Sequence, residues 1–313
     1  MTNQLVRFIV FFAVSLLLCP LLAGIINKVK AFFAGRRGVR VLQLYYDIFK
    51  LLKIERVHSR SASWLLPLAP VAVLAFTIGA LAFLPLGGVA SPLGFAGDAV
   101  LFFYLLATAR FLTVLAALET GSSFEGMGAS REVQFAAFAE GTVFAMLALL
   151  VMISGAIDLT GMLSIAVINP ESSMHTAATV LAGVAFFLVL LCENCRVPFD
   201  DPETHLELTM IHEAMVLDYG GPDLAAVFYG AALKLWVFAV FFVSLLLPGS
   251  LLGSFWGMFY LLGGVFLTAV VVGVVESCMA RSRFLKVPQL LAGATAMVLV
   301  AVMLWIFYAG GVK

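Results

Sequence analysis

Ionisable side chains interrupt several of the most apolar stretches of this 313-residue sequence. A charge inside a membrane costs several kcal/mol unless it is paired or faces water, so such residues are candidates for function. They are Arg110, Glu140 and Lys234 within apolar stretches, and Glu119, Glu193 and Glu276 where such stretches end.

Two kinds of chemistry suit this set. Carboxylates spaced through a protein interior and bridged by water can pass protons along, and a nearby lysine can change their occupancy electrostatically. Alternatively, Arg110 pairs with Glu119 or Glu140, and Lys234 pairs with a carboxylate of the loop that follows it, only to let polar groups stay buried. The set as a whole favours an ion path, while both interpretations stay open for each single residue.

A second concentration of charge lies between residues 193 and 223, where eight acidic residues accompany one arginine. An acidic surface between two spanning helices is expected to face a protein partner or to take up protons. Its proton-path candidates are Glu193, Glu203, Glu207, Glu213 and Asp218. Its candidates for docking or structural charge are Arg196, Asp200 and Asp201.

Metal binding is the alternative use of the same segment, because His205, Glu207, His212 and Glu213 are possible ligands. The position four residues after His212 is Val216, so the segment lacks the His-Glu-x-x-His spacing of a helical zinc site. The pair Cys192 and Cys195 has no second Cys-x-x-Cys to complete a tetrahedral site. We therefore expect no metal in this chain and ordinary buried thiols at both cysteines.

The composition excludes a water-soluble globule. Hydrophobic residues make up 63% of the chain, charged residues 12%, and the mean hydropathy is +1.10. Soluble domains are about 45–50% apolar and about 25% charged. The 18 basic and 18 acidic residues cancel, which gives no support to a nucleic-acid binder.

Eight segments are long and apolar enough to span a membrane, for which a helix needs about 20 residues. They are residues 5–26, 64–86, 98–118, 133–157, 174–192, 224–247, 254–276 and 287–310. The sequence thus predicts an all-α, polytopic membrane protein that forms one integral membrane domain over residues 1–313. Between the first two spans, apolar residues recur at helical spacing over 39–54, which predicts an amphipathic helix at the cytoplasmic interface or packed on its neighbours.

The loops between these spans alternate in charge. Loops 87–97, 158–173 and 248–253 contain no Lys or Arg, whereas the other four connections hold fourteen of the eighteen basic residues. Because basic loops stay on the cytoplasmic side, we expect these four there and both termini outside. Arg36, Arg37 and Arg131 lie in them and are available for docking contacts.

The segment from Glu193 to Leu208 is similar to the pattern Glu-x-Asn-Arg-x-Pro-Phe-Asp-x-Pro-Glu-Ala-Glu-x-Glu-Leu of the subunit 1 (H-type) membrane proteins. That family is shared by respiratory complex I and the energy-converting nickel-iron hydrogenases. Asp218-Tyr219-Gly220 resembles the family's later Glu-Tyr-x-Gly. The first loop, Arg36-Arg37-Gly38 through Leu51, also resembles the family, so the similarity covers nearly the whole chain.

Where the sequence departs from the family pattern, the differences indicate which branch of the family it resembles. Glu203-Thr204-His205 stands where the quinone-reducing members keep Glu-Ala-Glu, and Asp218 replaces a glutamate. The segments 118–132 and 200–210 look like those of subunit 4 of formate hydrogenlyase and the hydrogenase-type subunits. The resemblance therefore favours the hydrogenase branch.

The resemblance implies a non-catalytic subunit in a bacterial or archaeal cytoplasmic membrane that binds no cofactor itself. A hydrogenase large subunit and a small iron-sulfur subunit would dock on the cytoplasmic side with the nickel-iron site and the clusters. Antiporter-like subunits would lie laterally. Protons would move by way of the acidic residues named above and Lys234, and the arginines with Asp200 and Asp201 would serve docking or structure.

The sequence leaves two alternative functions open. In the first, the same platform closes a cavity around a quinone headgroup, as in an NADH-quinone oxidoreductase. In the second, the chain is a stand-alone secondary transporter. The second is disfavoured because the sequence shows no inverted repeat or paired Gly-interrupted helices.

Overall fold

The computed structural model describes residues 2–57, 63–164, 173–200, 210–247, 249–252 and 256–311. Eight helices in these ranges are long and apolar enough to cross a membrane, which confirms the polytopic all-α fold. They are α1 (Thr2–Phe33), α3 (Leu65–Phe83), α4 (Asp98–Glu119), α5 (Ser123–Ser154), α7 (Ser173–Glu193), α9 (Gly221–Leu246), α11 (Gly257–Cys278) and α12 (Val287–Gly311).

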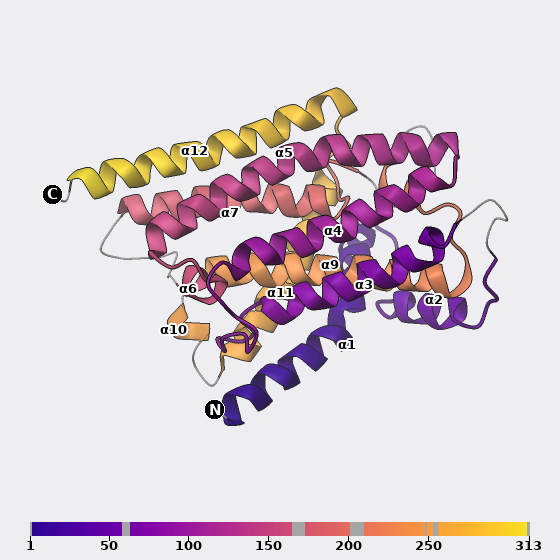
Figure 1. The fold of residues 1–313 in the computed structure, drawn as a ribbon, viewed down its shortest axis with the longest axis horizontal. Coiled ribbons are helices and arrows are strands. Elements are labelled where there is room, and N and C mark those ends of the chain that lie inside the picture. Colours follow the sequence, from indigo (N-terminus) through magenta and orange to yellow (C-terminus); the bar gives the residue numbers. More distant parts are fainter. Residues whose placement is uncertain are drawn as a thin grey trace.

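Shorter helices occupy the connections (Figure 1). They are α2 (Gln43–Leu51), α6 (Leu159–Leu163), α8 (His212–Met215), α10 (Gly249–Leu252) and the 3-10 turn η1 (Phe284–Lys286). The helix α2 confirms the amphipathic helix expected over 39–54, although it is shorter at both ends.

The fourth span differs most from its prediction, because α5 begins ten residues before the expected start at residue 133. Residues 123–132 are too polar for a membrane span, but their polar groups find partners inside the protein. Glu125 accepts hydrogen bonds from the Thr120 hydroxyl and from the Asp218 backbone N–H, the latter at 3.1 Å. Arg131 donates to the Met210 carbonyl at 3.1 Å. The helix therefore extends out of the apolar region into the connecting loops.

Helix α9 lies at the centre of the bundle and contacts α1, α3, α7 and α11. Its middle turns hold fully buried aromatic side chains, among them Trp236, Phe238 and Phe241. Phe241 stacks with Phe102 of α4 and packs on Phe186 of α7. A helix that is apolar on all sides belongs in the interior, so α9 is the element against which the other spans pack.

Helix α1 contains Pro20, which has no N–H to donate to the Leu16 carbonyl. The Tyr229 hydroxyl of α9 takes this place and donates to the Leu16 oxygen at 2.7 Å. The Tyr45 hydroxyl of α2 donates to the next carbonyl, that of Leu17. Two tyrosines from other helices therefore satisfy the backbone around the proline and tie α1 to α2 and α9.

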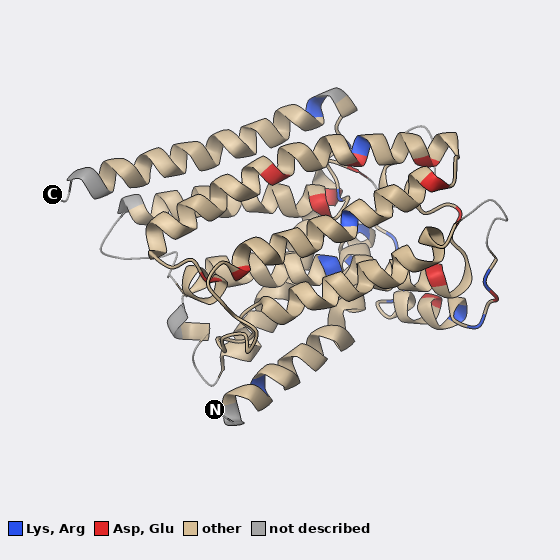
Figure 2. Ribbon diagram, in the orientation of Figure 1, with Lys and Arg blue, Asp and Glu red and all other residues tan. Residues whose placement is uncertain are grey.

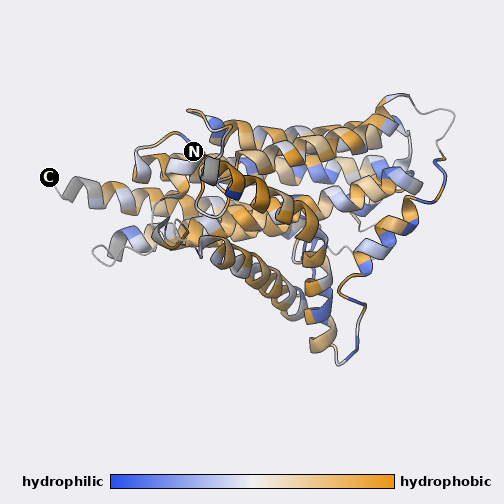
Figure 3. Cartoon of the chain, turned by 90° about the horizontal axis from the view of Figure 1, so that it is seen from below, coloured by the Kyte–Doolittle hydropathy of each residue, from blue (hydrophilic) through white to orange (hydrophobic). Residues whose placement is uncertain are grey.

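The two ends of the bundle differ in charge. Both termini lie at one end, while α2 and the turn between α4 and α5 lie at the other (Figure 1). Most coloured charges lie in the half of the bundle toward α2 and that turn (Figure 2). The helices are apolar over most of their length (Figure 3). We call the end with α2 the basic end.

Candidate functional site

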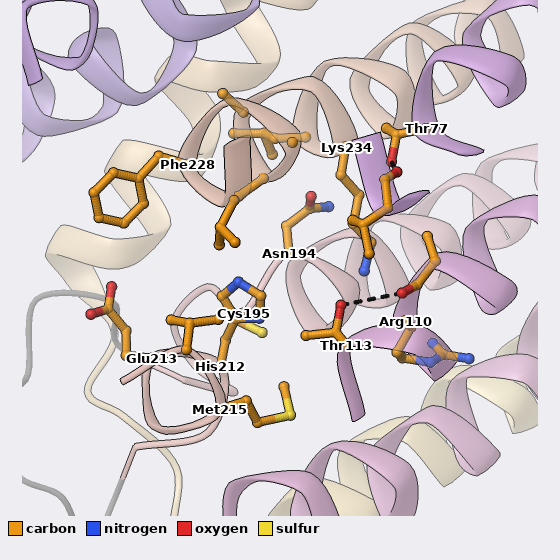
Figure 4. Close-up of a pocket in the computed structure, with 18 of the residues that line it drawn as sticks. Thr77, Arg110, Thr113, Asn194, Cys195, His212, Glu213, Met215, Phe228 and Lys234 are labelled. Atoms are coloured by element: carbon orange, nitrogen blue, oxygen red, sulfur yellow. Dashed lines mark hydrogen bonds between the residues drawn. The ribbon is translucent and has the colours of Figure 1, made fainter. Parts of the chain in front are cut away.

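A cavity of about 290 Å³ opens among α3, α4, α9 and the end of α7, and α8 with the turn after it also lines it. Apolar side chains form much of its wall, and Arg110, Glu132, Glu193 and Lys234 stand at one side of it. Figure 4 shows Lys234 reaching in from α9 on the side where Arg110 and Thr113 of α4 lie. Charged side chains therefore line a cavity inside the bundle.

The end of α7 sets the direction of two of these side chains. The Arg196 N–H donates to the Leu191 carbonyl at 2.8 Å, and Cys195 has a φ of 50°. This is a Schellman-type helix end, in which the left-handed position is usually glycine. After this turn Glu193 is bound to Arg110 of α4, and Arg196 is bound to Glu276 of α11.

The start of α9 positions Lys234. Gly221 has a φ of 56°, and a Cβ there would come within 2.8 Å of the Glu55 carbonyl and 2.9 Å of the Ile54 carbonyl. Only glycine permits this close approach between the end of the first loop and α9. Pro222 then follows in the first turn, where its fixed φ suits a helix start.

Ion pairs join four helices, α4, α5, α7 and α9, beside the cavity. Glu193 binds the Arg110 guanidinium through one carboxylate oxygen and Lys234 Nζ through the other, the latter at 3.0 Å. Arg110 also binds Glu140, whose side chain is 47% exposed at the outer side of α5. We call Arg110, Glu132, Glu140, Glu193 and Lys234 the cavity cluster.

These contacts correct part of the sequence interpretation. Arg110 pairs with Glu140, as one alternative had it, but its second partner is Glu193 and not Glu119. Lys234 pairs with Glu193, which precedes α9 in the chain, and not with a carboxylate of the following loop. Pairings between helices far apart in sequence depend on the tertiary fold and carry no local signal.

Glu132 is a site residue that the sequence analysis missed. It is buried, lines the cavity and lies 4.0 Å from the Cys195 sulfur, while no Lys or Arg of the described residues lies within ion-pair distance. It was assigned to a loop because its neighbours are polar. Its spacing of eight residues from Glu140, which puts both on one face of α5, is the signal that could have found it.

A second group of charges lies toward the basic end. Glu276 of α11 receives Lys30 Nζ at 3.3 Å and Arg196 Nη1 at 3.4 Å. Asp200 binds Arg281 Nη2 at 2.8 Å. We call Lys30, Arg196, Asp200, Glu276 and Arg281 the rim cluster. These pairs connect the loop after α7 with α1, α11 and the loop before α12.

The rim cluster binds the backbone of Ile211 and His212. The other oxygen of the Asp200 carboxylate, Oδ2, accepts from the Ile211 N–H at 3.1 Å and from the His212 N–H at 3.4 Å. The His212 ring borders the cavity, and burial followed by the charge of Lys234 lowers its pKa from 6.5 to about 4. Burial and the nearby Glu132 raise the pKa of the Cys195 thiol, so this thiol stays protonated.

The remaining predicted residues fall into three groups. Glu213 lines the cavity, whereas Glu119 accepts from the Ser63 N–H and the Asp218 side chain is exposed. Arg36 and Arg37 are exposed, while Arg131 lies 4.5 Å over the Phe284 ring. Asp201, Glu203, His205 and Glu207 lie outside the described residues.

The described residues contain no group of three His, Cys, Asp or Glu side chains that would hold a metal ion. The ionisable groups that line the cavity are carboxylates, the cations of Arg110, Arg196 and Lys234, the Cys195 thiol and the His212 imidazole.

The sequence profile of the NADH dehydrogenase family matches residues 6–309. The chain is 31% identical over 316 residues to hydrogenase-4 component C of Escherichia coli K12, covering 97% of each chain. It is 31% identical to formate hydrogenlyase subunit 4 of the same organism, covering 91% of this chain and 92% of the relative. The H-type subunit of the NADH-quinone oxidoreductase of Anaplasma phagocytophilum is 27% identical over 71% of this chain and 70% of the relative.

The fold matches a chain in the structure of the membrane-bound sulfane sulfur reductase, an archaeal respiratory membrane complex. The TM-score is 0.81 at 18% identity, and the match covers 97% of this chain and 99% of the other. The family profile and the two relatives at 31% identity, each over most of the chain, agree with the motifs around Glu193 and Asp218. The chain belongs to the NADH dehydrogenase family, among the membrane proteins that resemble the H-type subunit of complex I.

Proposed function

We propose that this chain anchors the redox arm of an energy-converting nickel-iron hydrogenase of the formate hydrogenlyase type and couples electron transfer to ion translocation. The two relatives at 31% identity are components of hydrogenase-4 and formate hydrogenlyase, whereas the quinone oxidoreductase subunit matches less of the chain at lower identity. The altered acidic motif at residues 203–205 supports the same choice.

The observation that carries the coupling role is the charge balance of the cavity cluster. Two cations, Arg110 and Lys234, face the three carboxylates Glu132, Glu140 and Glu193. Glu132 is buried without an ion pair to any described residue, and a carboxylate in this position is stabilised when it takes up a proton. A proton at Glu132 could then exchange with Glu193, and Glu140 leads from Arg110 to the outer side of the bundle.

The other parts of the complex follow from the family. The large hydrogenase subunit and the small iron-sulfur subunit would hold the nickel-iron site and the clusters and would dock at the basic end, where Arg36 and Arg37 are exposed. Antiporter-like membrane subunits would lie beside Glu140. The basic end would face the cytoplasm and both termini the outside of a bacterial or archaeal cytoplasmic membrane.

The test uses Glu132→Gln in membrane vesicles that contain the assembled complex, with hydrogen evolution and proton translocation measured together. Glutamine keeps the size of the side chain but cannot carry the proton. We expect hydrogen evolution and assembly to be retained, and protons moved per turnover to fall roughly tenfold or more, as for the loss of a proton-transfer group. Glu140→Gln and Glu193→Gln should also weaken coupling.

The matched control is Glu55→Gln, which removes an exposed carboxylate outside the cavity cluster. Normal proton translocation by the Glu132→Gln complex would assign Glu132 to structure alone. A purified complex that oxidised NADH with quinone, contained no nickel and evolved no hydrogen would contradict the hydrogenase assignment itself.

The cavity favours one second candidate, a quinone site. At about 290 Å³, it is close to the ~300 Å³ lower bound of pockets that bind small molecules, and its wall is largely apolar. The measurement on the purified complex described above separates this candidate from the first, because a quinone site requires quinone-dependent turnover.

A further inference from the structure

Helix α2 carries two apolar faces, although it needs only one to pack on the bundle. Leu44, Ile48 and Leu51 are partly covered, and α2 contacts α1 and α9. On the other side Leu42, Tyr46 and Phe49 follow one another at a spacing of four and three residues and are exposed, Phe49 by 62%. Residues at this spacing form one continuous stripe on a helix. No residue of α2 is fully buried.

Basic side chains flank the exposed stripe. Arg40, Lys50 and Lys53 are exposed, and none of them forms an ion pair with a carboxylate of the described residues. Asp47, the acidic residue of α2, instead accepts a hydrogen bond from Gln43 at 2.9 Å. We call Leu42, Tyr46 and Phe49 with Arg40, Lys50 and Lys53 the α2 surface. It is apolar in the middle and positive at its edges.

The position of α2 restricts what this surface can meet. The Tyr45 hydroxyl ties α2 to the Leu17 carbonyl of α1, a helix long enough to span the membrane. Helix α1 ends in Phe32 and Phe33, which are exposed by 80% and 53%. Exposed aromatic rings beside basic residues at the end of a spanning helix are typical of the layer where hydrocarbon meets headgroups. Helix α2 lies at the end of the bundle away from both termini (Figure 1).

We propose that the α2 surface binds anionic phospholipids of the leaflet at the basic end, with Leu42, Tyr46 and Phe49 between the acyl chains and Arg40, Lys50 and Lys53 on the headgroups. The charge pattern selects this partner, because an apolar stripe with lysines on its flanks gains both burial and electrostatic attraction at an anionic membrane surface. The proposal does not depend on which redox subunits the chain binds.

The experiment places a reporter on the stripe in the full chain. Phe49→Trp is reconstituted in vesicles of equal parts phosphatidylglycerol and phosphatidylcholine, with bromine on the acyl chains of one lipid or the other. Quenching of the added tryptophan, after subtraction of the unsubstituted protein, reports which lipid contacts the stripe. We expect stronger quenching by brominated phosphatidylglycerol. Lys50→Gln with Lys53→Gln in the same reporter should reduce this preference by about fivefold per lysine.

The matched control is Arg283→Gln with Lys286→Gln, which removes the same charge from exposed positions in the loop before α12. It should leave the preference at Phe49→Trp unchanged. Equal quenching by the two lipids, or an equal loss of preference in the control, would overturn the proposal. So would the absence of quenching by either lipid in the assembled complex, because a protein subunit would then cover the α2 surface.

Discussion

The cavity cluster and the rim cluster are made of the same residue types but differ in their balance of positive and negative charge. The cavity cluster sets two cations against three carboxylates beside an open cavity. The rim cluster sets three cations, Lys30, Arg196 and Arg281, against two carboxylates that join loops and helix ends, and its members Arg196 and Asp200 also line the cavity. A carboxylate that has no ion pair and lies beside a cavity can bind and release a proton. Carboxylates that are each paired with a cation instead hold segments of the chain together. Charge in the interior therefore has two uses in one molecule.

Loss of a residue of the rim cluster should lower the free energy of unfolding more than loss of a residue of the cavity cluster. Glu276→Ala removes the carboxylate that Lys30 and Arg196 share, so both cations lose their ion pair with Glu276. Breaking a buried ion pair by removing one partner costs about 3–5 kcal/mol. We expect a loss of this size in the free energy of unfolding, measured in detergent by chemical denaturation.

Glu132→Gln is the comparison variant for this measurement, because Glu132 has no ion pair to lose among the described residues. It should leave the free energy of unfolding unchanged or slightly raised. If Glu276→Ala and Glu132→Gln lowered the free energy of unfolding equally, the two clusters would not differ in their contribution to stability.

The sequence could predict the spans because composition and length decide them, and the observed boundaries of most spans lie within a few residues of the prediction. It could also identify Arg110, Glu140, Glu193 and Lys234 as unusual, because charge in an apolar stretch is visible without a structure. It could not predict that Glu193 joins Arg110 to Lys234, since that contact requires α4, α7 and α9 to converge.

Arg131 and Arg196 show a further limit of sequence reasoning. Both were expected to serve docking or structure, and basic residues in loops are usually exposed. In the structure Arg196 is bound to Glu276, and Arg131 is bound to the Met210 carbonyl and lies over Phe284. Replacing them would therefore disturb the loops of this chain as well as any contact with a partner.

His212 links the two clusters and should give a smaller, pH-dependent effect. Its backbone N–H is bound by Asp200 of the rim cluster, and its ring lies near Lys234 of the cavity cluster. The pKa of the ring is about 4 in the folded protein against 6.5 for a free histidine, so between these values only the unfolded chain binds the proton. Stability is therefore full above pH 6.5 and falls as the pH is lowered toward 4.

The expected loss from this group at pH 5 is about 2 kcal/mol. The measurement compares the free energy of unfolding at pH 7 and pH 5 for the unsubstituted protein and for His212→Gln. The free energy of unfolding of the variant should fall less on acidification. The carboxylates of the protein titrate in the variant as they do in the unsubstituted protein. An identical pH dependence in the two proteins would show that the ring is accessible to protons in the folded state.

The smallest effect should come from Lys30→Met, because Glu276 then keeps Arg196 as a partner. Lys30 is 19% exposed in its side chain, so we expect a cost of roughly 1 kcal/mol in the free energy of unfolding. Arg196→Met alone should behave similarly. The double variant should cost clearly more than the sum of the two, because it leaves the buried Glu276 carboxylate without a cation. Simple additivity would mean that the two cations do not share Glu276, and the rim cluster would then be two independent contacts.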